Sequence, residues 1–143
     1  MSDRNRQHRA SNLHLRRVLF ADFTAGTVVG CALLTLSTWL ETVYAIPRML
    51  LLAMGAAGLI YASLAISLLF RPVPSPRLVA VLGSANLMWA VFCVAAALLL
   101  FRSASWLGIA HLALEAGFVS WLGVTELRLR SESLAIEARQ GAT

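Results

Sequence analysis

The sequence contains no lysine and few charged residues of either sign. Only 13% of its 143 residues are charged, whereas 59% are hydrophobic and the mean hydropathy is +0.74. A soluble domain usually carries about a quarter charged residues, which leaves enough polar surface to cover its core. This composition excludes an ordinary soluble domain and indicates an integral membrane protein in contact with the lipid bilayer.

The chain also lacks the motifs of the common enzyme and redox classes. Its two cysteines, Cys31 and Cys93, lie far apart, so no C-x-x-C pair exists. No G-x-S-x-G, Walker A, H-E-x-x-H or glycine-rich dinucleotide loop is present. A buried cysteine is most often a small apolar residue. We therefore expect no cofactor, no metal site and no catalytic residue.

All twelve basic residues other than histidine are arginine, and they cluster at the ends of apolar segments. Such arginines keep their side of the chain in the cytoplasm and attract anionic lipid headgroups. We interpret them as topogenic and expect no nucleic-acid partner. Residues 1–16 are polar and Arg-rich, which predicts a disordered or interfacial cytoplasmic arm. Arg16-Arg17 faintly resembles an export signal, but Asp22 interrupts the apolar region that such a signal needs.

The remaining charges divide residues 17–128 into four apolar spans, at about 18–40, 48–70, 78–101 and 105–127. Each is long enough to cross about 30 Å of hydrocarbon as a helix, the form that satisfies its own backbone hydrogen bonds in lipid. The connections 41–47, 71–77 and 102–104 are short, so consecutive helices should be antiparallel neighbours. The predicted fold is an all-α, up-down-up-down bundle of four transmembrane helices. Residues 129–143 should form a cytoplasmic tail, with a short amphipathic helix allowed there.

The arginines also predict the orientation of this bundle. Ten of them fall before the first span, between the second and third, or after the fourth, and only Arg48 and Arg102 fall in the other two connections. The positive-inside rule places both termini in the cytoplasm. We expect a multi-pass protein of the inner (cytoplasmic) membrane.

Glu115 is the most informative polar residue, because its place in the fourth span puts it near the bilayer midplane. A carboxylate there costs a few kcal/mol, so an intramembrane acid is a functional hypothesis by default. His111 precedes it by one helical turn and lies on the same face. We expect Glu115 to face inward in its neutral form and to be hydrogen-bonded. The pair is either an exchange site or a structural polar contact.

Asp22 lies about one turn inside the first span, with Gly26 and Gly30 on the same helical face. A Gly-x-x-x-Gly stripe lets a second helix approach closely. This face should therefore pack against another helix, and Asp22 should be a paired carboxylate that meets Arg16, Arg17 or Arg71. A proton or substrate site is the alternative.

Counting residues inward places Tyr61, Asn86 and Trp89 near the same depth. Three spans would then each contribute a hydrogen-bonding side chain close to the midplane. The set is either a small binding cavity or a group of polar contacts between helices, each contributing about 0.6 kcal/mol.

Two short motifs carry a resemblance to a known group. The segment from Leu15 to Asp22, followed by small residues, together with Asn86-x-x-Trp89, resembles a family of small bacterial four-helix integral membrane proteins of uncharacterised function. The resemblance covers residues 13–130. It implies the four-span fold and no activity.

The sequence favours a non-enzymatic accessory or scaffold protein that forms a homo-oligomer or joins a larger membrane complex. Small residues suited to helix packing favour this role: Gly26, Gly30, Gly55, Gly58, Gly83, Gly108, Gly117 and Gly123. The alternative is a small proton-coupled transporter that uses Glu115, His111 and Asp22. A weaker alternative is a lipid-modifying enzyme with Glu115 and His111 as acid and base. A water-accessible cavity that reaches Glu115 would favour transport, a lateral opening toward lipid would favour the enzyme, and a dry, sealed bundle would favour the accessory role.

Overall fold

The computed structural model describes the backbone of residues 3–71 and 75–140, and the side chains of residues 13–71 and 75–131. Within these ranges every regular element is a helix: α1 (Asp3–Thr35), α2 (Ser37–Tyr44), α3 (Arg48–Leu69), α4 (Pro76–Leu99) and α5 (Trp106–Gln140). All but α2 contain a segment that is long and apolar enough to cross a membrane. The prediction of an all-helical chain with four candidate membrane spans is confirmed.

The two ends of the chain differ from the expected arm and tail. α1 begins at Asp3, so most of the segment expected to be disordered or interfacial is continuous with the first span. α5 likewise continues from the fourth span through the expected tail to Gln140. Helix propagation adds one hydrogen bond for each residue that is fixed, so an established span readily extends into adjoining polar sequence.

The first span ends at Thr35, earlier than predicted, and α2 occupies part of the expected connection. Thr35 donates a side-chain hydrogen bond to the carbonyl of Cys31, one of the local contacts that compete with regular helix geometry. α2 is followed by Ala45, which has a left-handed backbone with φ of 50°. The backbone N–H of Ser105 donates a 2.8 Å hydrogen bond to the carbonyl of Tyr44, which joins the start of α5 to the end of α2.

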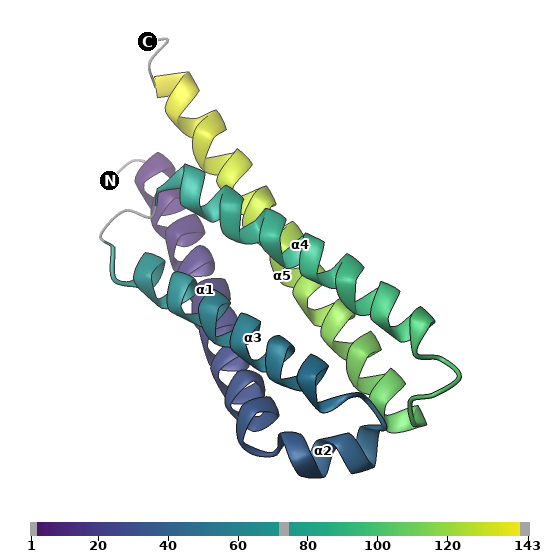
Figure 1. The fold of residues 1–143 in the computed structure, drawn as a ribbon. Coiled ribbons are helices and arrows are strands. Elements are labelled where there is room, and N and C mark those ends of the chain that lie inside the picture. Colours follow the sequence, from purple (N-terminus) through teal and green to yellow (C-terminus); the bar gives the residue numbers. More distant parts are fainter. Residues whose placement is uncertain (1–2, 72–74, 141–143) are drawn as a thin grey trace.

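The helices pack closely in two pairs, α1 with α3 and α4 with α5 (Figure 1). Glycines line both contacts. A Cβ atom added to Gly26 would lie 2.9 Å from the carbonyl oxygen of Gly58, and one added to Gly30 would lie 2.9 Å from that of Gly55. Residue numbers rise along one helix as they fall along the other, so the helices of this pair are antiparallel. Because glycine has no side chain, the two backbones approach almost to contact.

Contacts between the two pairs are sparser. α3 and α4 follow each other in the chain but contact each other little, which differs from the expectation that all consecutive spans are close neighbours (Figure 1). No described glycine of α3 contacts α4. Instead, the bulky rings of Tyr61 and Trp89 lie between these helices, with their centroids 6.1 Å apart. Bulky aromatic side chains keep helix axes further apart than glycines do.

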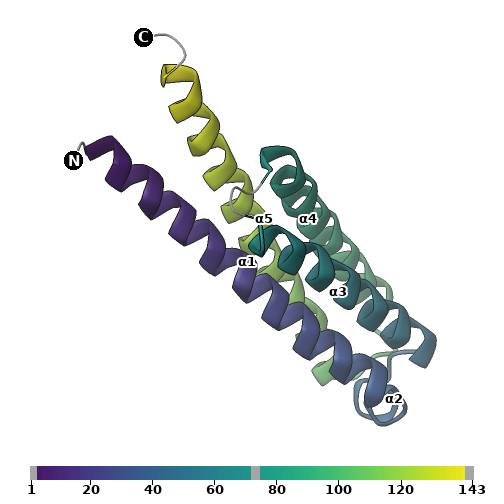
Figure 2. The same ribbon diagram turned by 90° about the vertical axis from the view of Figure 1, so that its left-hand side faces the viewer.

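Two apolar clusters lie at different heights along the bundle. The first contains Leu19, Leu68, Leu82 and Leu122 among its buried members. The second lies nearer α2 and contains Leu33, Leu51, Met54, Cys93 and Leu112 among others. The start of α1 and the end of α5 lie together at the opposite end of the bundle from α2 (Figures 1 and 2).

Candidate functional site

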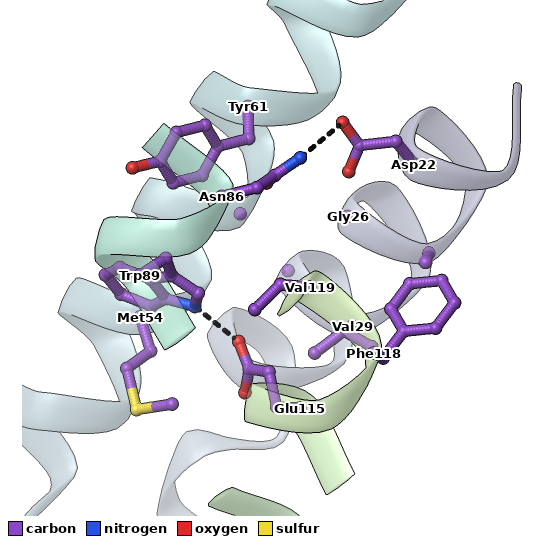
Figure 3. Close-up of a pocket in the computed structure, with 13 residues that line it drawn as sticks. Asp22, Gly26, Val29, Met54, Tyr61, Asn86, Trp89, Glu115, Phe118 and Val119 are labelled. Atoms are coloured by element: carbon purple, nitrogen blue, oxygen red, sulfur yellow. Dashed lines mark hydrogen bonds between the residues drawn. The ribbon is translucent and has the colours of Figure 1, made fainter. Parts of the chain in front are cut away.

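A cavity lies between the two helix pairs, at a height between the two apolar clusters (Figure 3). Its volume is about 50 Å³, counted as the space open to the centres of water molecules. One water needs about 10–15 Å³ by that measure, so the cavity has room for several. Its polar and aromatic lining consists of Asp22, Tyr61, Asn86, Trp89, Glu115 and Phe118, and small or apolar residues complete the wall.

Glu115 lines the cavity and is held there by Trp89. The indole N–H of Trp89 donates a 2.8 Å hydrogen bond to Oε1 of Glu115, and the Glu115 side chain is only 16% exposed. Trp89 is itself packed between Tyr61 and Phe92, whose ring centroids lie 6.1 and 4.8 Å away. Packing on both sides fixes the indole and therefore aims the carboxyl group.

His111 lies beside Glu115, one helical turn earlier on α5. Its Nε2 atom is 3.3 Å from Oε2 of Glu115, within ion-pair distance, but the two atoms are not aligned for a hydrogen bond and neither has another partner. The imidazole stacks on Tyr44 of α2, with ring centroids 5.1 Å apart. His111 does not line the cavity, so it adjoins the carboxyl group from the side nearer α2.

A second polar group joins Asp22, Asn86 and Glu126. The amide nitrogen of Asn86 donates to Oδ2 of Asp22 at 3.4 Å and to Oε2 of Glu126 at 3.2 Å. All three residues are buried, with exposed fractions of 4% or less. Asp22 and Asn86 line the cavity (Figure 3), whereas Glu126 is not among its lining residues.

Comparison of this chain with protein-family models, characterised proteins and solved structures found none that matches. Function is therefore inferred from the chemistry of the site.

Most of the site residues proposed from the sequence meet at one place. Asp22, Tyr61, Asn86, Trp89 and Glu115 line the cavity, and Gly26 and Gly30 form part of its wall while packing on α3. His111 lies outside the cavity, next to Glu115.

The expected partner of Asp22 is wrong. Its hydrogen-bond partner is Asn86, and the side chain of Arg16 donates instead to the carbonyl of Leu69 at 2.8 Å. The long guanidinium group of Arg16 reaches a free carbonyl at the end of α3, where helix carbonyls have no partner of their own.

Glu126 is the site residue that sequence reasoning missed. It follows Glu115 by three turns of α5 and lies on nearly the same face, since about 3.6 residues complete a turn. That spacing is visible in the sequence and was the signal available. The residue lies at the edge of the predicted fourth span, away from the midplane where the candidate site was sought, yet its side chain is fully buried.

The cavity is lined by acidic and not by basic side chains. Two carboxyl groups line it, and no arginine or histidine side chain among its lining residues opposes them. Across the described residues, no three His, Cys, Asp or Glu side chains group as a metal site requires. Carboxylates framed by aromatic rings are suited to bind an organic cation, because ring faces attract positive charge.

Proposed function

We propose that this protein is a small membrane transporter that exchanges an organic monovalent cation for protons, with Glu115 as the cation-binding carboxylate. The observation that carries the proposal is the cavity between the helix pairs, lined by Glu115 and Asp22 and by no cationic side chain. Intramembrane acids that face a cavity typically mark substrate and proton pathways. Tyr61, Trp89 and Phe118 supply the aromatic surface that an ammonium group favours.

The position of the cavity supports transport rather than binding alone. On each helix, the lining residues fall between residues of the two apolar clusters; on α4, for example, Asn86 and Trp89 lie between Leu82 and Cys93. The clusters separate the cavity from the two ends of the bundle. A site with packed apolar residues toward each end of the bundle, between two helix pairs that contact each other sparsely, suits alternating access by movement of one pair against the other.

The glycines that favoured the accessory or scaffold hypothesis mostly pack within this chain. Of the eight glycines that suggested packing against a partner, all but Gly117 have neighbours from other parts of this chain within 4 Å of an added Cβ. They therefore bind the helices of one molecule together. For the weaker hypothesis of a lipid-modifying enzyme, His111 would have to share the cavity with Glu115, but it stacks on Tyr44 outside it.

The transport proposal predicts that Glu115→Gln abolishes cation uptake. Proteoliposomes with an acidic interior should accumulate tetramethylammonium, a cation that cannot cross as a neutral amine. Glutamine keeps the size of the side chain and an oxygen for the Trp89 N–H, but it removes the negative charge. We expect at least a tenfold loss of uptake, which corresponds to about 1.4 kcal/mol. Glu41→Gln, which alters an exposed carboxylate far from the cavity, is the matched control. Uptake by Glu115→Gln at the wild-type rate would refute the proposal.

We also propose that both termini lie in the cytoplasm and that the protein resides in the inner membrane of a bacterium. The ten-to-two arginine distribution supports this orientation. In a variant without Cys31 and Cys93, a cysteine at exposed Ser103 should react with an impermeant maleimide added outside intact cells. A cysteine at exposed Arg71 should react only after the cells are lysed. The reverse labelling pattern would mean that both termini lie outside the cytoplasm.

A further inference from the structure

Asp22 and Glu126 come from helices at opposite ends of the chain and meet at one amide group. The side-chain nitrogen of Asn86 has two hydrogens and donates one toward each carboxyl group, at 3.4 and 3.2 Å. The exposed fraction is 4% for Asp22 and 0% for Glu126. The carboxyl groups are thus held close together in a place that water does not reach freely.

Glu126 is incompletely satisfied in this arrangement. Its Oε1 atom is buried and has no hydrogen-bond partner. A buried polar atom without a partner costs about 1–3 kcal/mol, and more when the group is charged. The unpartnered oxygen therefore points to a ligand that supplies positive charge or a hydrogen, and a proton is the smallest such ligand.

Among the described side chains, no cation lies within ion-pair distance of the two carboxyl groups. The charged or titratable side chains nearest to the pair along the surrounding helices are Arg16 and Arg17 on α1, Tyr61 on α3, Arg77 and Cys93 on α4, and Glu115, Arg128 and Arg130 on α5. Among the described side chains, the sole contact within ion-pair distance is that of His111 with Glu115. Arg130 lies one turn beyond Glu126, and its buried Nε has no hydrogen-bond partner. Two buried carboxylates this close cannot both ionise at low cost, so such a pair retains a proton.

Asp22 connects this pair to the cavity. It lines the cavity wall, whereas Glu126 does not. A cation in the cavity is therefore stabilised when Asp22 is ionised and loses that stabilisation when Asp22 is neutral. The charge of Asp22 therefore acts directly on a cation bound in the cavity.

We propose that Asp22 and Glu126 form the proton-coupling site of the transporter, an inference that rests on the transport function proposed above. One proton leaves the pair as one monovalent cation enters the cavity, so the charge of the site does not change. Asn86 holds the two carboxyl groups in place throughout. Because linkage is reciprocal, a proton on the pair weakens cation binding by the same factor by which the cation weakens proton binding.

The test measures tetramethylammonium affinity in detergent as a function of pH. In Asp22→Asn/Glu126→Gln neither side chain can bind an exchangeable proton, but both amides can still accept the Asn86 hydrogen bonds. We expect the pH dependence of the affinity to fall by about one proton, which is a tenfold smaller change for each pH unit. A pH indicator in weakly buffered solution should also show fewer protons released on cation binding. An unchanged pH dependence and proton release would overturn the inference.

The outcomes separate this inference from the function on which it rests. If wild-type protein does not bind tetramethylammonium, or if Glu115→Gln binds it equally well, the proposed function fails. If binding requires Glu115 but keeps its full pH dependence in the double variant, only the coupling site fails. A dependence on Na⁺ at constant pH that is lost in the double variant would overturn the assignment to protons. Should the double variant not fold, Asp22→Asn alone is measured, because only Asp22 lines the cavity, and it should lose the same proton.

Discussion

Replacement of Gly123 by leucine should separate α4 from α5 and unfold the protein, whereas the same replacement at Gly117 on the same helix should be tolerated. A Cβ added at Gly123 would lie 2.6 Å from the carbonyl oxygen of Gly83 and 3.0 Å from Cγ of Leu87. The carbonyl oxygen of Gly83 belongs to the backbone, so it cannot move away as a flexible side chain can. Gly117 has nothing within 4 Å of an added Cβ. The helix, the residue type and the new side chain are the same, so the comparison isolates the contact with α4.

The expected loss at Gly123 is large, because overpacking against a fixed backbone costs about 1–3 kcal/mol even when the neighbours can shift in part. Thermal unfolding in detergent should show a clearly lower midpoint for Gly123→Leu and a midpoint near wild type for Gly117→Leu. Equal effects at the two sites would contradict the α4–α5 contact. A loss at Gly117 that appears together with dissociation of an oligomer would instead revive the scaffold hypothesis, since Gly117 would then face a second chain.

The spans could be predicted from the sequence because the membrane imposes them. Lipid requires about 20 apolar residues in a helix, and the charges between Arg48 and Arg102 mark where each such run begins and ends. The face formed by Gly26 and Gly30 could be assigned to a helix contact for a similar reason, since small residues one turn apart are suited to close packing. The structure places Gly58 and Gly55 against them.

The pairing of the helices could not be predicted in the same way. Loop length indicates that consecutive helices return through the membrane, but it does not say how closely they pack. That depends on which side chains face each other, and Tyr61 and Trp89 hold α3 away from α4 while glycines bring α4 onto α5. The break at Leu36 was also hidden, because the apolar run continues through it without a proline or glycine.

The burial of Glu126 was the other feature that could not be predicted by counting residues along a span. Counting residues along a span gives the height of a side chain but not the direction in which it points. Side chains on a helix tilt toward its N-terminus, which turns the carboxyl group of Glu126 from the end of the span back toward Asn86. Glu126, at the end of the predicted fourth span, thus joins Asp22 inside the bundle, where the two share one donor.

Asn86→Leu should therefore be strongly destabilising, although leucine is close to asparagine in size and more suited to an apolar interior. The substitution removes the donor that Asp22 and Glu126 share, and both carboxyl groups stay buried. Each group left without its hydrogen bond costs about 1–3 kcal/mol, and a charged group costs more. We expect the midpoint of thermal unfolding in detergent to fall further than for a substitution of similar volume in a lipid-facing position, such as Met88→Leu, whose side chain is 73% exposed.

Removal of the whole network should reverse most of this loss. In Asp22→Leu/Asn86→Leu/Glu126→Met the three side chains become apolar at similar volume, and no buried polar group remains to be satisfied. Replacement of buried charged networks by packed apolar residues is often neutral or stabilising, by about 1–4 kcal/mol. The triple variant should therefore be more stable than Asn86→Leu while its cation binding loses the coupling to protons, because stability and coupling place opposite demands on these residues. If the triple variant is less stable than the single one, the polar group stabilises the bundle by itself. The carboxyl groups of Asp22 and Glu126 would then have a structural role. A polar network that is kept for proton coupling should instead make the helix bundle less stable than apolar residues in its place would.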